Sequence, residues 1–322
     1  MVKRVLSLVL VFAAACALLC GCTNQTGTTE TTKETIPPMD IMQKTDPAQD
    51  EELNILMIGN SFCYYYVEEL YGMLTAAGYK NVNVCNVYYS GCPLEKHWQW
   101  WKSGEANYDY YTTNETGRNG IKSTNLEYCL NQRNWDIISL QEASSSIRIQ
   151  SNRDVQAHMQ LTQTYRTDLW GYLKEQFPMS RYFWHQTWAN QIGYDRNNYQ
   201  VESLQQQEED MLIAKEFSVA ICKEQKLERI NTGEAWQIVR RGGYDNLCAR
   251  LSVNAGEGDY YHDGDIGGGQ YLNACVWFEA ITGQSCVGNT YRPDYALDGN
   301  LIPTLQAAAH KAIEQRNAED NK

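Results

Sequence analysis

A single serine, Ser61, follows an apolar run that ends in a glycine, in the stretch Ile55-Leu56-Met57-Ile58-Gly59-Asn60-Ser61-Phe62. Such a run is typical of a buried strand in a parallel sheet, and the catalytic groups of these sheets gather beyond the carboxyl ends of the strands. Ser61 would stand at such an end, where a nucleophile can meet its substrate. Taken alone, the stretch fits better with a turn glycine followed by a serine that caps a helix.

A serine hydroxyl becomes a useful nucleophile only when a base takes its proton and an acid orients that base. Among the five histidines, His262 is preceded three residues earlier by Asp259, in a loop-like stretch with glycines on both sides. One turn of chain brings such a pair to the same side, so Asp259 could accept from one imidazole nitrogen while the other faces Ser61. The spacing is compatible with an acid–base pair. His158 and His310 fall in helical patterns, where we expect solvent-facing positions.

Acyl transfer also needs hydrogen-bond donors that point at the developing oxyanion. Gly91 follows a second strand-like run and could present its backbone N–H, and Gln141 ends a third run and brings a side-chain amide. Since the carboxyl ends of parallel strands meet at one edge, these groups and Ser61 are predicted to converge there.

The order of these blocks resembles the SGNH hydrolase superfamily, also called GDSL-type esterases, in a bacterial branch whose first block reads Gly-Asn-Ser-Phe. The resemblance extends from Asn54 to about Gly283. It implies a nucleophile, a general base and an orienting acid, which are Ser61, His262 and Asp259. It also implies three oxyanion donors, which are the N–H groups of Ser61 and Gly91 and the amide of Gln141.

Two positions depart from the pattern of that superfamily. Asn60 stands where an aspartate usually precedes the serine, and Gln141 stands where the third block usually supplies an asparagine. A glutamine amide offers the same donor on one additional methylene. The donor role can therefore survive with a shifted backbone.

Strand-like and helix-like patterns alternate along the chain, which indicates a parallel sheet covered on both faces. The strand-like runs are Leu53–Gly59, Val82–Tyr88, Trp135–Leu140, Arg181–Trp184 and Leu227–Ile230. The helix-like patterns are Tyr64–Ala77, Val155–Phe177, Ser203–Lys223, Gln270–Ile281 and Leu305–Arg316. We predict an α/β fold, a three-layer α/β/α sandwich with a central parallel sheet, of the SGNH hydrolase-like and flavodoxin-like kind.

The N-terminus has the pattern of a bacterial lipoprotein signal. Lys3 and Arg4 precede an apolar stretch, Val5–Leu19, that is too short for a stable transmembrane helix. The next residues resemble the lipobox, which implies cleavage before Cys22 and a lipid on its sulfur. We expect a signal peptide at 1–21, a disordered tether at 22–51, the hydrolase-like domain at 52–316 and a frayed end at 317–322. The protein would be held outside the cytoplasm on a bacterial membrane.

A long insertion, Cys92–Asn134, interrupts the alternation. It is polar and aromatic, and insertions of this length tend to be functional loops. Aromatic faces can stack on sugar rings as well as pack in a core. Outside the insertion, His185 follows the fourth strand and could compete with His262 as the base. We expect a packing or hydrogen-bonding role for His185 before a catalytic one. The candidate substrate contacts are His97, Trp98, Trp101, His185 and Trp188.

Acidic residues outnumber basic ones, and the formal net charge is −12. This charge argues against a nucleic-acid partner and against electrostatic docking on anionic lipid, so the lipid alone would attach the protein to its membrane. We assign no cofactor. A cluster of Asp259, His262, Asp263 and Asp265 could hold a cation but does not match the calcium-loop pattern, so we assign no metal. Gly267–Gly269 lacks a phosphate-binding pattern and indicates a helix entry.

The function that these features favour is an esterase that removes acetyl or other short acyl groups, with carbohydrate as the expected substrate, through an acyl-Ser61 intermediate. A lipid-anchored glycan-binding protein that kept the fold but lost turnover is the alternative from another class. An O-acyltransferase would use the same residues. The cysteines beyond the signal lack C-x-x-C spacing, and their pairing stays open.

Overall fold

The computed structural model describes residues 51–143, 145–196, 198–250 and 264–320. The predicted signal peptide, the tether and Cys22 lie outside the described residues, as do Asp259, His262 and Asp263. The chain divides into two units, Met1–Gln43 and Lys44–Lys322, and only the second contains described residues.

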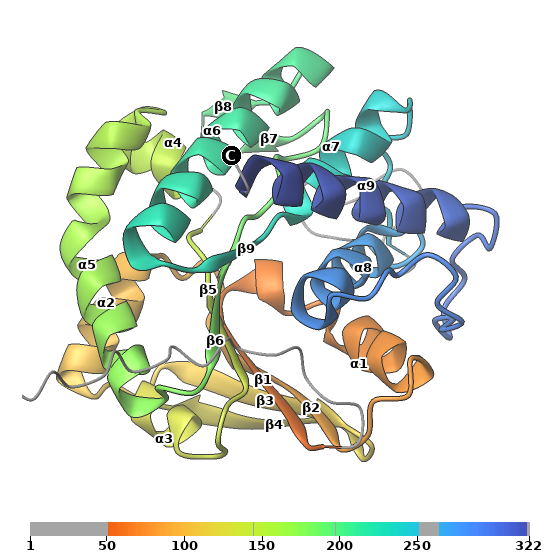
Figure 1. The fold of residues 1–322 in the computed structure, drawn as a ribbon. Coiled ribbons are helices and arrows are strands. Elements are labelled where there is room, and N and C mark those ends of the chain that lie inside the picture. Colours follow the sequence, from red (N-terminus) through yellow and green to blue (C-terminus); the bar gives the residue numbers. More distant parts are fainter. Residues whose placement is uncertain (1–50, 144, 197, 251–263, 321–322) are drawn as a thin grey trace, which may run out of the picture. The chain divides into compact units, whose positions relative to one another are not determined.

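The second unit is built on a seven-stranded sheet in the order β4-β3-β2-β1-β5-β6-β9 (Figure 1). Every neighbouring pair from β2 to β9 in that order is parallel. The parallel strands therefore run 2-1-3-4-5 by chain order, the order of flavodoxin-like folds, and the predicted α/β fold is confirmed. These strands are β1 (Leu53–Gly59), β2 (Val82–Tyr88), β5 (Ile137–Leu140), β6 (Arg181–His185) and β9 (Glu228–Ile230).

The aromatic insertion is not the loop that the sequence predicts. It contains helix α2 (Leu94–Ser103), an antiparallel hairpin of β3 (Tyr108–Asn114) and β4 (Gly117–Thr124), and the short helix α3 (Leu126–Leu130). Strand β3 pairs with β2, so the hairpin extends the sheet at one edge. Tyrosine and threonine have high strand propensity, and the side chains of β3 alternate between buried and half-buried at its start.

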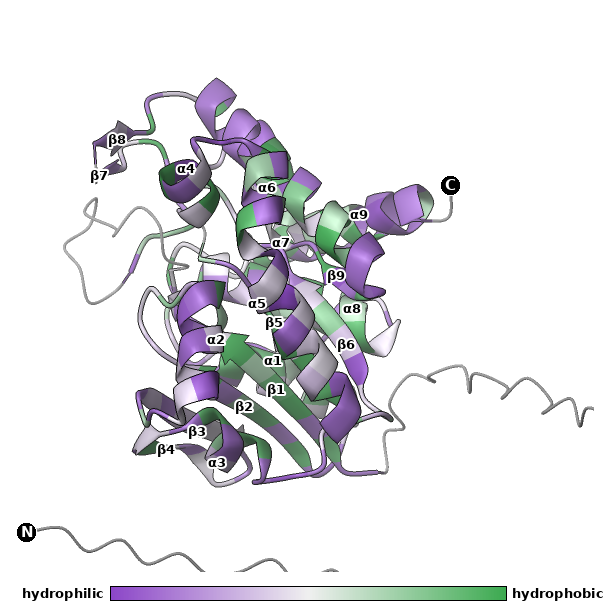
Figure 2. Ribbon diagram, turned by 90° about the vertical axis from the view of Figure 1, so that its left-hand side faces the viewer, coloured by the Kyte–Doolittle hydropathy of each residue, from purple (hydrophilic) through white to green (hydrophobic). Residues whose placement is uncertain are grey.

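Helices cover both faces of the sheet, because β1 sends alternate side chains into two different apolar clusters. Ile55 and Met57 belong to one cluster, and Leu56 and Ile58 belong to the other. Figure 1 shows α2 and α5 on one side of the sheet and α1, α8 and α9 on the other. In Figure 2 the central strands carry hydrophobic residues while the covering helices show hydrophilic ones.

The remaining bounds are η1 (Ser61–Cys63), α1 (Val67–Ala76), α4 (Ser146–Ser151), α5 (Val155–Gln176), β7 (Asp195–Arg196), β8 (Tyr199–Gln200), α6 (Leu204–Gln225), α7 (Thr232–Arg241), α8 (Gly269–Thr282) and α9 (Ile302–Asp320).

Local sequence signals set where several helices begin. Asp154 caps α5 by accepting from the backbone N–H of Ala157, and Ser203 and Gln206 form a capping box at the start of α6. Helix α9 is longer than the predicted Leu305–Arg316 and continues to Asp320, four residues into the segment that is predicted to fray. None of the helices in the described part is long and apolar enough to cross a membrane.

Candidate active site

Ser61 begins the short 3-10 helix η1, directly beyond the carboxyl end of β1. The side chain is buried, with 6% of its surface exposed. No described residue forms a hydrogen bond with its hydroxyl. The only bond made at this residue within the described part is the one its carbonyl accepts from the N–H of Tyr64. The strand-to-helix turn thus presents, at the sheet edge, a hydroxyl that is unbonded within the described part of the chain.

Asn60 connects the turn after β1 with the loop after β2. Its side-chain oxygen accepts from the backbone N–H of Phe62 at 3.1 Å, and its side-chain nitrogen donates to the carbonyl of Cys92 at 3.1 Å. The side chain is almost fully buried. Because a backbone N–H can only donate and a carbonyl can only accept, these two partners fix which end of the amide is oxygen.

Gln141 reaches the same turn from the end of β5. Its Nε2 donates to Asn60 Oδ1 at 2.6 Å. A Cβ atom at Gly59 would lie 2.7 Å from both Cγ and Cδ of Gln141, closer than real carbon contacts allow. Gly59 is therefore needed because the glutamine side chain lies against the backbone there. The structure brings the first and third sequence blocks together beside Ser61.

Gly91 lies in the loop after β2, one residue before the carbonyl that Asn60 holds. Its φ of +65° falls in the left-handed region, which glycine adopts without strain. The residue is exposed, a Cβ there would meet nothing, and its N–H makes no hydrogen bond with any described residue. An N–H on a loop anchored to Asn60 is available for a ligand at this edge.

The loop 251–263 carries the predicted base His262 and the predicted acid Asp259, and it lies outside the described residues. The residues on either side of it are described. The guanidinium carbon of Arg250 stacks 4.1 Å from the ring centroid of Tyr65, and Gly264 donates its N–H to the carbonyl of Leu247 at 3.0 Å. The residues that flank the loop on both sides are therefore held by contacts with the described part of the chain. On the N-terminal side, Arg250 lies against Tyr65, two residues after η1.

His185, at the end of β6, is not the substrate contact or competing base that its position suggested. The ring is 1% exposed, and its two nitrogens lie 3.0 Å from Gln141 Oε1 and 3.0 Å from Thr232 Oγ1. Burial lowers the pKa of His185 to about 3, so the ring is neutral at physiological pH. A neutral, buried imidazole whose two nitrogens both make hydrogen-bond contacts is a structural partner of Gln141.

Two more of the predicted substrate contacts are buried. His97 is fully covered and bonds Tyr108 through Nδ1 at 2.9 Å, and burial lowers its pKa to about 3. Trp188 is 1% exposed and stacks on Trp236 with ring centroids 4.7 Å apart. Because neither side chain offers a face to a ligand, their assignment as substrate contacts is corrected here.

The two remaining aromatic candidates are half-buried on α2. Trp98 donates to Asp168 at 2.9 Å, and Trp101 stacks on Tyr172 at 4.6 Å. Both partners belong to α5, so these tryptophans join the two helices that cover one face of the sheet. Lys102 lies 4.0 Å from the centroid of the Trp101 ring.

Sequence reasoning missed Glu142, which lies next to Gln141. Its Oε1 accepts from the N–H of Leu94, the first residue of α2, at 3.2 Å and from the N–H of Ala143 at 2.7 Å. Its Oε2 lies 3.4 Å from Nε2 of His158, which is fully buried and not on a solvated face as predicted. The carboxylate thus satisfies the start of α2 and holds the loop that leads from Gly91.

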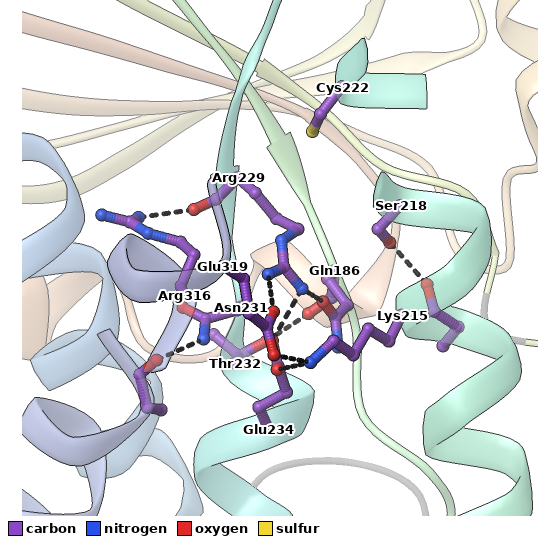
Figure 3. Close-up of polar contacts among 12 residues, drawn as sticks. Gln186, Lys215, Ser218, Cys222, Arg229, Asn231, Thr232, Glu234, Arg316 and Glu319 are labelled. Atoms are coloured by element: carbon purple, nitrogen blue, oxygen red, sulfur yellow. Dashed lines mark hydrogen bonds and ion pairs between the residues drawn. The ribbon is translucent and has the colours of Figure 1, made fainter. Parts of the chain in front are cut away.

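A network of polar and charged side chains joins β9, α6, α7 and α9 (Figure 3). We call it the Arg229 network; its members are Gln186, Lys215, Arg229, Glu234 and Glu319. The buried Arg229 donates to Gln186 Oε1 at 2.8 Å, to Glu234 at 2.7 Å and to Glu319 at 3.1 Å. Lys215 lies 2.7 Å from Glu234 and 2.5 Å from Glu319. Thr232 donates to the carbonyl of Gln186 at 2.6 Å, which connects the network to the partner of His185.

The glycine run before α8 has a packing role. A Cβ at Gly269 would meet the Trp236 ring and the carbonyl of Leu247, and one at Gly267 would collide with the carbonyl of Asn246. Gly268 has a φ of +86° and is the N-cap of α8. The predicted helix entry is confirmed. In the described part of the chain, no three potential ligand side chains gather to hold a metal ion.

Among protein families, the model described as Domain of unknown function (DUF4886) matches residues 54–312. A crystal structure of a DUF4886 family protein from Bacteroides uniformis is 26% identical to this chain. It has a TM-score of 0.69 and covers 82% of this chain and 95% of its own. That likeness supports the fold described above. A comparison with curated proteins gives no match.

Two enzymes of known structure are more distant. An acetylxylan esterase from Geobacillus stearothermophilus is 13% identical, with a TM-score of 0.44 and coverage of 77% of this chain and 100% of its own. An alpha/beta hydrolase enzyme from the metagenome of Lake Arreo is 11% identical, with a TM-score of 0.46 and coverage of 73% and 98%. Likenesses this weak concern the fold alone.

Proposed function

The chain belongs to the DUF4886 family, and from that premise we propose that it is a serine esterase with Ser61 as its nucleophile. The observation that supports this most is the convergence at the sheet edge. The turn that carries Ser61, the loop of Gly91 and the amide of Gln141 are joined through the single side chain of Asn60. Residues more than 80 positions apart in the sequence are thereby joined at the turn that carries Ser61, whose hydroxyl bonds no described residue.

In the proposed reaction, Ser61 Oγ attacks the carbonyl carbon of an ester while His262 accepts the hydroxyl proton and Asp259 orients the imidazole. The N–H groups of Ser61 and Gly91 and the amide of Gln141 stabilise the oxyanion that forms. Collapse of this intermediate expels the alcohol, which takes the proton from His262. A water molecule, deprotonated by the same histidine, then attacks the acyl group and releases Ser61 and the acid.

The substrate that we propose is an acetyl or other short acyl ester, carried by a carbohydrate. The short acyl part rests on the resemblance of the sequence blocks to GDSL-type esterases. The carbohydrate part rests on the exported, lipid-anchored location that the N-terminal pattern predicts.

The test of the esterase is hydrolysis of p-nitrophenyl acetate and longer acyl esters by the full-length protein and by a Ser61→Ala variant. We expect turnover that is highest for acetate and lost in Ser61→Ala. Ser139→Ala is the matched control, because Ser139 is a buried serine within β5 rather than beyond its end. Its activity should equal that of the wild type.

Retained turnover in Ser61→Ala would remove Ser61 from the mechanism. If no ester is hydrolysed but acetylated glycans bind, the glycan-binding alternative takes precedence. Transfer of the acyl group to an added sugar in preference to water would identify the acyltransferase.

We also propose that Cys22 carries a lipid that holds the protein on the outer side of a bacterial membrane. The support is the sequence pattern of the first 22 residues. Cell fractionation tests it: the wild type should sediment with membranes, and a Cys22→Ala variant should not be recovered as a lipidated membrane protein. Equal lipid labelling of the two would contradict the assignment.

A further inference from the structure

A continuous chain of hydrogen bonds runs from the nucleophile turn into the protein interior. It passes from Asn60 to Gln141 at 2.6 Å, from Gln141 to His185 at 3.0 Å and from His185 to Thr232 at 3.0 Å. All four side chains are buried, with at most 1% of their surface exposed. Buried polar networks of this kind are stable only when each donor meets an acceptor, so the position of every proton can be worked out.

The direction of the chain is fixed at Asn60 by two backbone groups. The atom facing the N–H of Phe62 must be Oδ1, and the atom facing the carbonyl of Cys92 must be Nδ2. The Gln141 atom that contacts Asn60 Oδ1 must then be its nitrogen, which leaves Gln141 Oε1 toward His185. An oxygen accepts, so Nδ1 of His185 carries a proton.

The other side of the ring faces a hydroxyl, which can donate or accept. Thr232 Oγ1 lies 3.0 Å from His185 Nε2 and 2.6 Å from the carbonyl of Gln186, and its one proton can serve only one of them fully. If Nε2 also donated, a doubly protonated, charged imidazole would sit in an apolar surrounding of Tyr66, Trp188 and Trp277. Burying an unpaired charge is costly, so the neutral ring is favoured, and its Nε2 shares the Thr232 proton with the Gln186 carbonyl, which the hydroxyl contacts at the shorter distance.

We propose that His185 is a positioning residue for the oxyanion site, and that it holds the Gln141 amide in place as the neutral tautomer protonated at Nδ1. The oxygen of the Gln141 amide then accepts from His185, and one N–H of the amide donates to Asn60. The second N–H of the same amide has no partner among the described residues and is available to the oxyanion. This assignment rests on the proposed function for its catalytic consequence, while the tautomer itself does not depend on turnover.

The tautomer can be measured without substrate by ¹⁵N NMR of the full-length protein labelled at histidine, since the two ring nitrogens differ in shift when one is protonated. We expect one of the five histidines to remain protonated at Nδ1 alone across pH 5–8 and to disappear from the spectrum of a His185→Phe variant. Protonation at Nε2 alone, or at both nitrogens, would overturn the proposal. A Thr232→Val variant provides a second reading: loss of the hydroxyl should shift the Nε2 signal and leave Nδ1 protonated.

Kinetics with the ester substrate test the positioning role. Removing one oxyanion donor costs on the order of 10²–10³ in turnover, and Gln141→Ala should show this loss. His185→Phe should lower kcat by at least 10-fold through the same donor, with little change in KM. His185→Asn should recover most of it, because asparagine carries its amide nitrogen at the δ position.

The double variant Gln141→Ala/His185→Phe separates positioning from general stability. If His185 acts through Gln141, the double variant is no slower than Gln141→Ala alone. Independent, additive losses would show that the histidine supports the fold and would overturn the positioning role. A wild type without ester turnover, but with the Nδ1 tautomer in the spectrum, would instead reject the esterase and keep the hydrogen-bond assignment.

Discussion

Asn60 shows why a single atom exchange matters at this site. An aspartate, the residue that SGNH hydrolases usually place before the serine, could still accept from Phe62 and from Gln141. Its second oxygen would face the carbonyl of Cys92, which the amide nitrogen contacts at 3.1 Å in this chain. Two acceptors repel each other, so the loop that carries Gly91 requires the asparagine.

The variant Asn60→Asp is therefore expected to lower both turnover and stability. Leaving a buried acceptor without its donor costs about 1–3 kcal/mol, and the released loop would move the Gly91 N–H away from the proposed oxyanion site. Thermal unfolding and ester hydrolysis measure the two effects. Asn125→Asp is the matched control, because this half-buried asparagine caps α3 through its side-chain oxygen, which aspartate keeps, and its nitrogen has only a long contact of 3.5 Å with the Gly104 carbonyl. An Asn60→Asp enzyme with wild-type values would contradict the hydrogen-bond assignment.

Gly59 makes a second prediction at the scale of one residue. A methyl group there would push against the Gln141 side chain and displace the amide from Asn60. Turnover by Gly59→Ala should fall toward that of Gln141→Ala, by on the order of 10²-fold. Gly299→Ala, where an added Cβ meets open space, should leave turnover unchanged. If the Gly59 variant keeps full activity, then the close contact does not govern the amide.

Among the elements, α8 depends most on the absence of side chains at its start. The backbone carbonyls of Asn246 and Leu247 occupy the space where Cβ atoms of Gly267 and Gly269 would lie. A backbone carbonyl cannot move aside for an added Cβ in the way that the end of a flexible side chain can. The close approach therefore keeps residues 246–249, which precede the loop of His262, against the first turn of α8.

We expect Gly267→Ala to destabilise the protein by more than about 1 kcal/mol, since overpacking against backbone typically costs 1–3 kcal/mol. Denaturant unfolding would measure it. Gly171→Ala is the control: its Cβ has open space within α5, and alanine exceeds glycine in helix propensity by up to about 1 kcal/mol. The control should be as stable as the wild type or more so, and an equal effect of both variants would contradict the packing explanation.

The elements also show what the sequence could and could not predict. The bounds of β1 and β2 are predicted to the residue, because short runs made mostly of apolar residues and bounded by glycine or a turn admit few other structures. The hairpin β3–β4 was missed because its tyrosines and threonines lack an apolar run, and helix α7 was not predicted at all. The place of Gln141 beside Ser61 follows from parallel strand ends meeting at one edge. The burial of His185 does not, because it depends on side chains from β6, α7 and α8 that only the packed structure brings together.

At the scale of the whole molecule, α9 is joined to α8 by a pH-dependent contact. His310 Nδ1 lies 3.1 Å from Glu279 Oε2, and the hydrogen bond to this carboxylate raises the pKa of His310 above its ordinary value of 6.5. A raised folded-state pKa means that the charged ring contributes its full stability below about pH 6.5. That contribution is lost as the pH rises through the folded-state pKa.

The variant His310→Gln should accordingly be less stable than the wild type at pH 6 and should approach it at pH 9. The difference will be small because His310 is partly exposed. Thermal unfolding across this pH range would measure it. Lys311→Gln removes a neighbouring exposed charge without this partner and should show no such trend. A difference between His310→Gln and the wild type that does not change with pH would mean that the ion pair is not formed.

The Arg229 network gives the order of synthesis a consequence for activity. Translation proceeds from the N-terminus, so Ser61 and Gln141 exist long before Glu319, which lies near the last residue of the chain. Until Glu319 is made, Arg229 lacks one of its two carboxylate partners, and the segment that carries Thr232 lacks the support of α9. A chain that stops before α9 would thus carry Ser61, the proposed nucleophile, without the support that α9 gives to the segment of Thr232, so we expect the proposed oxyanion site to form only after α9 has been translated.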